Sequence, residues 1–421
     1  MLFKELQKTA LASLWFVFLT FPIMVIRVNT ITQTITWRWQ NMALVFFGSF
    51  FGGLIWRFAL TRRTVGVRPK VKTDDTIATD SSVVEELPWN KKLIAKTQIW
   101  WAQPAIRRPL IALVVVLLLA FPWLSSLYQT RIMVTALIYV MLALGLNVVI
   151  GLGGMLHLGY IAFFAVGAYT YGILFRFFGI GFWMAMPIAA VLSTTAGVLL
   201  ALPVLRLRGD YLAIVTLGFA EIVRIVLNNT TEFSGGPAGI RGIPRPSLFG
   251  ISMNLSSSVI YIFYIVLFFV ALTIFVMWRF ENSRIGRALV AMGEDDIAAE
   301  AMGVDIARTK MIAFALGSFW AGIGGVIFAG NVTFINPASF AVWQSIIVLS
   351  CVVLGGMGSI PGVIVGALGL ILIPEYLRAF SDYRMLIFGA VLVIMMVFRP
   401  GGLIQKKRRA YTFEVNQGGQ G

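Results

Sequence analysis

Apolar residues in this chain of 421 residues gather in long runs that are separated by short polar stretches. Several runs approach 20 residues, and a helix of about that length rises roughly 30 Å, the thickness of the hydrocarbon core of a bilayer. The pattern predicts an all-α fold, a polytopic bundle of about twelve transmembrane helices with about ten as the lower estimate. The expected spans are 10–26, 42–60, 110–127, 132–150, 156–178, 182–202, 211–227, 258–278, 311–329, 342–354, 362–373 and 385–398.

Polar segments divide the chain into four parts. We expect two accessory spans in 1–60, a cytoplasmic linker in 61–108, the main membrane domain in 109–405 and a basic cytoplasmic tail in 406–421. Lys and Arg concentrate in the loops that lie inside if the N-terminus is inside, as the positive-inside rule requires. An even number of spans then places both termini in the cytoplasm and the polar stretch 228–257 on the outer face.

The composition favours a membrane protein and argues against other classes. Apolar residues make up 59% of the chain and charged residues 12%, with a mean hydropathy of +0.87, whereas soluble proteins have about 45–50% and 25%. The net charge of +16 would suit a nucleic-acid-binding protein, but the basic residues lie between apolar runs, where they meet anionic lipid head groups. We therefore expect a lipid membrane as the surroundings and no nucleic-acid partner.

Side chains that carry most enzymatic chemistry are scarce in this sequence. His157 and Cys351 are its only histidine and cysteine, so a clustered His and Cys metal site and an intrachain disulfide are excluded. No Gly-Lys pair occurs, which excludes the phosphate-binding loop of ATPases. We therefore expect no catalytic residues, no metal and no cofactor, and we interpret His157 as a residue of a helix interface.

Glu221 and Arg224 form a charged pair within an expected span. They are three residues apart, so they share one face of the helix near the middle of the membrane. Because an isolated charge at that depth costs about 2.5–3.5 kcal/mol, we expect the two side chains to pair and to face each other or the bundle interior. The pair either locks helix packing or forms a gate or part of a substrate path.

The polar loop 280–310 predicts a short helix, since acidic residues favour a helix N-terminus and glycine favours its end. Four of its residues share an arc of about 140°, a small and slightly apolar face that suits a groove in a partner protein: Ile297, Ala298, Ala301 and Met302. A solvated surface helix is the alternative. The residues assigned to the short helix are Glu294, Asp295, Asp296, Ile297, Ala298, Glu300, Ala301, Met302 and Gly303.

Small residues recur at positions that favour close helix packing. One stripe repeats every fourth residue, at Gly317, Ala321, Gly325 and Ala329, and we interpret it as a packing face. The segments around Gly153 and Gly356 are rich in glycine and are candidates for broken or re-entrant helices.

Several stretches resemble the LivM type of permease subunit, of the LivHM family of branched-chain amino-acid importers. They are LGLNVVIGLGG at 144–154, LPVLRLRGDYLAIVTLGFAEIVRIVLNNTTEFSGGPAGI at 202–240, GRALVAMGEDDIAAEAMGVD at 286–305, VVLGGMGS at 352–359 and RPGGL at 399–403. The similarity spans roughly 130–405, and LRLRGDYLAIVTLG is its most specific block. Many relatives carry a Gln-x-Ser-Leu-Gly-His-like sequence where this chain has MLHLGY at 155–160, so the resemblance does not assign substrate contacts to that segment.

The resemblance implies a permease subunit in the bacterial inner membrane and a set of partners. These are a second permease of the LivH type, two ATP-binding subunits and a periplasmic binding protein that delivers leucine, isoleucine or valine. ATP would then be bound by the partners, and the predicted short helix at 294–303 would dock on the ATPase. The alternative is a secondary transporter that acts alone on a proton or sodium gradient, with Glu221 as its one ionisable group far from a loop.

Overall fold

The computed structural model describes residues 26–29, 34–37, 116–205, 207, 209–247, 254–376, 389, 393 and 401–404. The chain divides into two units, Met1–Pro109 and Leu110–Gly421. In the first unit, β1 (Ile26–Asn29) pairs antiparallel with β2 (Thr34–Trp37). The two accessory spans, the linker, the basic tail and nearly all of the last expected span lie outside the described residues.

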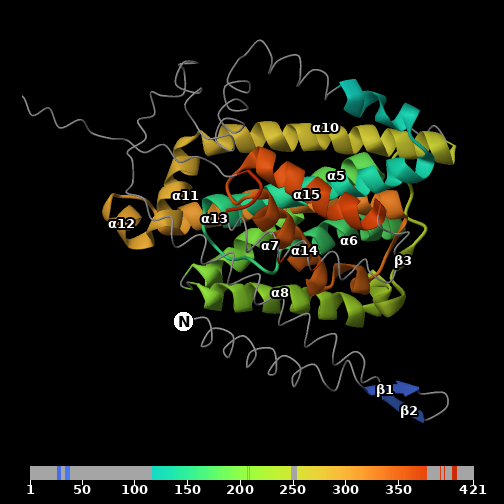
Figure 1. Ribbon diagram of the computed structural model, residues 1–421, viewed down its shortest axis with the longest axis horizontal. Helices are drawn as coiled ribbons and strands as arrows, with labels where there is room; N and C mark the ends of the chain where they lie inside the picture. The colour runs from blue at the N-terminus through green and yellow to red at the C-terminus, as the bar shows by residue number, and fades with distance from the viewer. Residues whose placement is uncertain are drawn as a thin grey trace, which may run out of the picture. The chain divides into compact units, whose positions relative to one another are not determined.

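The second unit is mostly helical (Figure 1). Its long helices are α5 (Leu127–Asn147), α6 (Ile161–Phe178), α7 (Phe182–Val204), α8 (Asp210–Asn229), α10 (Leu255–Glu281), α13 (Ile306–Val332), α14 (Val342–Gly355) and α15 (Ile360–Tyr376). Its shorter elements are η3 (Val148–Leu152), α9 (Thr231–Ser234), η4 (Gly236–Ala238), β3 (Ile240–Arg241), α11 (Arg284–Glu294), α12 (Asp296–Ala301), β4 (Phe334–Ile335) and η5 (Pro337–Phe340).

Helix lengths and compositions fit a membrane bundle. In the described part of the chain, six helical segments are long and apolar enough to cross a membrane, and α15 is a shorter apolar helix. The six are Leu127–Leu152, Ile161–Phe178, Phe182–Val204, Leu255–Glu281, Ile306–Val332 and Pro337–Gly355. A membrane-embedded helical fold is therefore confirmed, with the small antiparallel pairs β1–β2 and β3–β4 added to it; the number of spans and the sides of the termini stay predictions.

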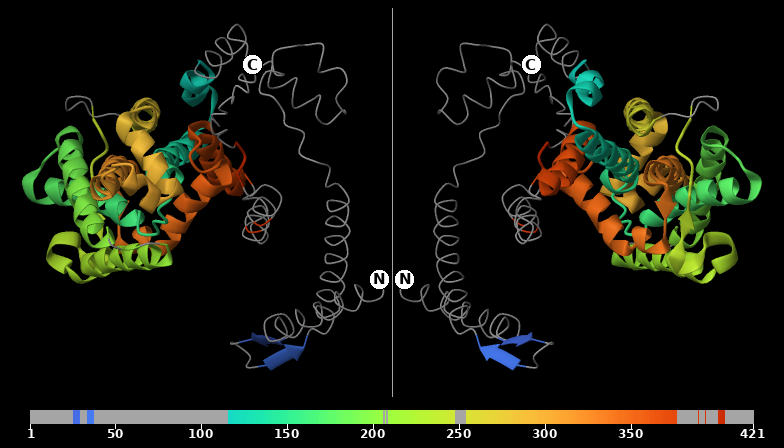
Figure 2. Two further views of the ribbon diagram at one scale, coloured as in Figure 1. Left: turned by 90° about the vertical axis from the view of Figure 1, so that its left-hand side faces the viewer. Right: turned by 90° about the vertical axis from the view of Figure 1, so that its right-hand side faces the viewer.

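α13 lies at the centre of the bundle and packs against α5, α6 and α7. Figure 2, which views the bundle from its two ends, shows α13 between α8 and α10. Gly317, Ala321, Gly325 and Ala329 are all buried, and a Cβ on Gly325 would collide with the carbonyl oxygen of Phe164 in α6. The interpretation of this stripe as a packing face is confirmed, because only the absence of a side chain lets the two backbones approach so closely.

The expected span 156–178 begins later than predicted. α5 ends in the π-turn η3, and α6 starts only at Ile161. Between them, Gly154 adopts a positive φ of 65°, and the Leu158 N–H donates to Thr216 Oγ1 of α8 at 3.1 Å. A polar side chain from another helix thus satisfies a backbone group that a continuous helix would have satisfied itself. The glycine-rich segment at Gly153 is therefore a break in the helical structure.

A second break separates α14 from α15 at Gly356 and Gly358, whose φ values are 114° and 78°. The two breaks contact each other, because the Gly358 N–H donates to Asn147 Oδ1 at 2.9 Å. Residues Leu403 and Ile404 donate backbone hydrogen bonds to the carbonyls of Leu354 and Gly355. The hydrogen bond between Asn147 and Gly358 spans 211 residues of sequence, so two glycine-rich segments far apart in the chain form one packed junction.

Candidate functional site

The α11–α12 arm, residues 284–301, projects from one end of the bundle, and β3 lies at the opposite end (Figure 1). Ser283 caps α11 by accepting from the Gly286 N–H at 3.0 Å. The buried residues Leu289 and Met292 fix α11 to the rest of the chain. Gly293 packs directly on the backbone of Gly153, so the arm rests on the break after α5.

α12 is a single short helix with a side-chain cap. The carboxylate of Asp295 accepts from the N–H groups of Ile297 at 2.8 Å and Ala298 at 3.0 Å, which satisfies two donors that a helix N-terminus leaves free. Met302 follows as its C-cap, and Gly303 then turns the chain with a φ of 85°. The short helix that the loop pattern predicts is present.

One buried contact orients α12. Lys310 Nζ in α13 lies 3.3 Å from a carboxylate oxygen of Asp296, and the Lys310 side chain is only 4% exposed. Ala299 is buried on the same inner side of α12. A buried lysine without an anionic partner would be costly, so this ion pair holds the helix in one orientation.

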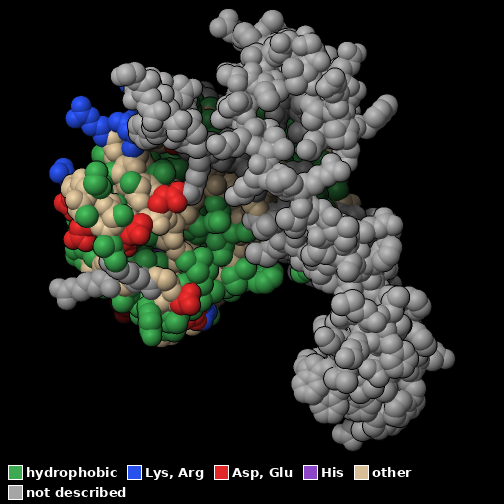
Figure 3. Space-filling model, turned by 60° about the vertical axis from the view of Figure 1, so that its left-hand side comes forward, with side chains coloured by type: hydrophobic (Ala, Val, Ile, Leu, Met, Phe, Trp, Pro, Cys, Tyr) green, Lys and Arg blue, Asp and Glu red, His purple; other side chains and the backbone are tan. Residues whose placement is uncertain are grey.

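The predicted docking face of α12 points outward. Ile297 is 65% and Met302 85% exposed, and Ala298 and Ala301 are also exposed. Figure 3, which brings this end of the molecule forward, shows acidic and basic side chains together with hydrophobic ones on the same surface. Glu294 was assigned to the start of this helix, but it is the last residue of α11, because Asp295 takes the extended conformation of an N-cap.

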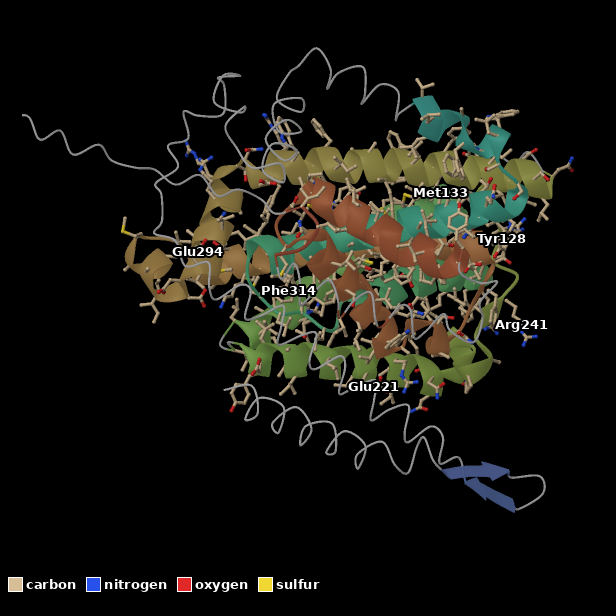
Figure 4. All side chains as sticks on the ribbon, viewed as in Figure 1. Tyr128, Met133, Glu221, Arg241, Glu294 and Phe314 are labelled. Carbon is tan, nitrogen blue, oxygen red and sulfur yellow. The ribbon has the colours of Figure 1, made fainter. Side chains whose placement is uncertain are left out.

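Glu221 and Arg224 pair as predicted. Arg224 Nε lies 3.0 Å from both carboxylate oxygens of Glu221, and Arg224 Nη2 contacts Oε1. The two side chains therefore face each other, which is one of the two expected arrangements, while they remain 32% (Arg224) and 36% (Glu221) exposed. Glu221 lies on α8, which forms one side of the bundle (Figure 4). The exposed part of the ion pair is therefore not covered by the described residues of this chain.

His157 is enclosed within this chain where α13 meets the start of α6, as its interpretation as a residue of a helix interface predicts. It is 1% exposed and its ring packs at centroid distances of 5.1 Å from Phe314, 5.6 Å from Phe163 and 6.0 Å from Tyr160. Both ring nitrogens lack a hydrogen-bond partner among the residues that the structure describes. The bulky aromatic neighbours come from α13 and the start of α6, and nothing in the local sequence shows that they meet.

Residues 128–396 match the protein family described as branched-chain amino acid transport system, permease component. This stretch holds both the α11–α12 arm and the Glu221–Arg224 pair. The chain belongs to the branched-chain amino acid permease family.

Several permeases of this family are similar to much of the chain. The high-affinity branched-chain amino acid transport system permease protein LivM of Salmonella typhimurium is 44% identical over 322 residues, which is 72% of this chain and 76% of that protein. The LivM protein of Escherichia coli is 44% identical over 319 residues, or 71% and 75%. The LivH protein of Escherichia coli is 27% identical over 287 residues, or 63% and 91%. No solved structure matches the chain.

Besides Thr216, sequence reasoning missed three polar residues that join separate elements of this permease. Asn147 accepts from Gly358 as described above, Ser345 Oγ accepts from the Ile161 N–H at 3.0 Å, and Lys310 pairs with Asp296. A buried polar residue inside or beside an apolar run was the signal available for each, since such a residue requires a partner. The identity of that partner depends on the tertiary structure.

Proposed function

We propose that this chain is a membrane-spanning subunit of an ATP-driven importer for branched-chain amino acids in the bacterial inner membrane. Its family membership and its 44% identity to two LivM proteins support this proposal. Similarity to LivH supports a second, related permease as its partner. Two ATP-binding subunits and a periplasmic binding protein complete the importer, and they supply ATP hydrolysis and substrate delivery.

α12 is the coupling helix in this proposal. Its exposed face of Ile297, Ala298, Ala301 and Met302 would enter a groove of an ATPase subunit, while the Asp296–Lys310 ion pair transmits the movement to α13. Docking of α12 on an ATPase subunit requires the α12 end of the bundle to lie in the cytoplasm. Both termini and the linker 61–108 then lie on the same side, in keeping with the positive-inside rule. The end that carries β3 is then the outer one.

The Glu221–Arg224 pair faces protein or the aqueous translocation path in this proposal. About a third of each side chain is exposed, and hydrocarbon is a costly environment for a charge at mid-membrane depth. The second permease is the partner that encloses such a path, so we place the α8 face with Glu221 toward it. An ion pair in that place can act as a gate or contact a zwitterionic substrate.

An Ala301→Arg variant tests the coupling role. A large charged side chain on the docking face should overfill the groove, so we expect normal amounts of membrane-inserted protein that neither co-purifies with the ATPase subunits nor supports leucine uptake. Ala307→Arg is the matched control, because Ala307 is also exposed but lies in α13, outside the docking face. Co-purification and uptake at wild-type levels for Ala301→Arg would return α12 to a solvated surface helix.

A secondary transporter is the competing function, and uptake into vesicles separates the two. With all proposed subunits present, leucine uptake should require ATP and should be inhibited by vanadate. Uptake that follows a proton or sodium gradient in vesicles containing this chain alone would contradict the proposal.

A further inference from the structure

A cavity of about 700 Å³ lies at the end of the bundle opposite α12. It is formed by the end of α6, the start of α7, the start of α10 and the segment 243–247 that follows β3. Its walls are mostly apolar and aromatic, and they include Phe175, Phe182, Trp183, Met184 and Tyr261. Neither the proposed function nor the relatives' descriptions assign a role to it.

The segment over this cavity is held firmly. The Ile243 N–H donates to the Thr333 carbonyl at 3.1 Å, and the Tyr171 hydroxyl donates to the Pro244 carbonyl at 2.8 Å. Ile243 is buried, and so is Pro246, which follows Arg245. Arg245 lies between two anchored residues, so its backbone is fixed where the side chain lines the cavity.

Arg245 brings a cation into these apolar walls. Its Nε is enclosed and has no hydrogen-bond partner among the described residues, and none of the described residues that line the cavity is acidic. Burial lowers the pKa of Arg245, and the positive charge of Arg131 at the start of α5 lowers it further. An anion in the cavity would relieve both effects, because it would accept from the guanidinium and balance the two charges.

The surroundings of the cavity are typical of a membrane interface. Trp183 is 49% and Met184 69% exposed, and aromatic side chains gather where hydrocarbon meets the head groups. Toward the middle of the bundle, α7 and α10 both pack on α13 and present exposed apolar side chains such as Val191 and Phe268. A ligand whose anionic group binds Arg245 can therefore extend long apolar chains along these two helices.

We propose that this cavity binds an anionic phospholipid, with its phosphate at Arg245 and its acyl chains along the apolar faces of α7 and α10. In the proposed topology the lipid belongs to the outer leaflet. A free amino acid matches the site less well, because its ammonium group would find no carboxylate among the lining residues that the structure describes. The lipid would fill the space between two helices that α13 joins, and so stabilise the outer end of the permease.

The test measures the lipids that stay bound to the full chain, co-expressed with a LivH-type permease and purified in detergent containing equal amounts of phosphatidylglycerol and phosphatidylcholine. Mass spectrometry gives the ratio of the two retained lipids. Arg245→Gln should lower retained phosphatidylglycerol relative to phosphatidylcholine by roughly tenfold, the effect of losing a charge-assisted hydrogen bond. Arg241→Gln is the matched control, because Arg241 lies at the same end but stacks over Phe334; it should keep the wild-type ratio.

A second variant leaves the charge in place and fills the space. Gly181 lines the cavity, a Cβ there meets no other atom, and its φ of −73° suits any residue, so Gly181→Trp should fold and also release phosphatidylglycerol. Gel filtration and thermal unfolding verify that each variant is folded. Wild-type lipid ratios in both variants, equal loss of both lipids, or release of the wild-type lipid by inorganic phosphate alone would each overturn the proposal.

Discussion

Lys310 and Asp296 form an ion pair across the junction of α12 and α13, with 3.3 Å between Nζ and a carboxylate oxygen. The lysine is almost fully buried, whereas Asp296 is about a quarter exposed. The contact therefore serves two needs at once: it neutralises a buried cation at the end of the central helix, and it orients the helix that projects from the bundle.

Asp296→Asn should weaken both the fold at this end and the proposed coupling. Removing the carboxylate charge leaves Lys310 buried without its anion, which costs about 3 kcal/mol for a well-buried pair and less here, because water reaches Asp296. We expect a lower thermal unfolding temperature and reduced co-purification with the ATPase subunits. Glu300→Gln removes the same charge from an exposed position of α12 and should leave the unfolding temperature unchanged; equal shifts in the two variants would contradict the prediction.

Glu221 and Arg224 should be energetically coupled. Leucine at one position removes one charge and leaves the other uncompensated, whereas leucine at both positions removes both charges. The double variant should therefore insert into the membrane better than either single variant. The measurement is a double-mutant cycle on the yield of membrane-inserted protein, with an interaction of about 0.5–3 kcal/mol expected. Additive losses would show that the two side chains act independently.

Gly325→Ala should destabilise the bundle although it adds a single methyl group. A Cβ on Gly325 meets the backbone of α6, and forcing extra atoms into a packed core costs about 1–3 kcal/mol. Gly218→Ala in α8 is the matched control, because a Cβ there meets nothing within 4 Å and alanine favours a helix by up to about 1 kcal/mol. Thermal unfolding in detergent compares them, and an equal or higher unfolding temperature for Gly325→Ala would refute the packing role.

A cysteine at Ser81 should report a cytoplasmic linker. Cys351 is buried, and replacing it with alanine removes the remaining background. We expect an impermeant thiol reagent added to intact cells to leave the new cysteine unlabelled and to label it after the membrane is opened. Rapid labelling in intact cells would reverse the proposed topology.

The resemblance to a permease family was readable from the sequence, because its most specific blocks, such as LRLRGDYLAIVTLG, are continuous. The α12 helix was readable as well: Asp295 caps the N–H groups of residues two and three positions later, which is a purely local interaction. Glu221 and Arg224 also meet because they share a helix face. How far the pair is exposed was not readable, because it depends on which helices cover α8.

The sequence by itself determined the elements whose physical cause is local: apolar runs long enough to span a bilayer, a capped loop helix and a charged pair one turn apart. Only the tertiary structure decided which distant groups complete one another. Thr216 satisfies the Leu158 N–H before α6 begins at Ile161, Asn147 joins the two glycine-rich breaks, and Nε of Arg245 has no hydrogen-bond partner among the described residues around an apolar cavity. Each of these depends on a polar group being enclosed away from water, and that enclosure arises only when helices far apart in the chain pack together.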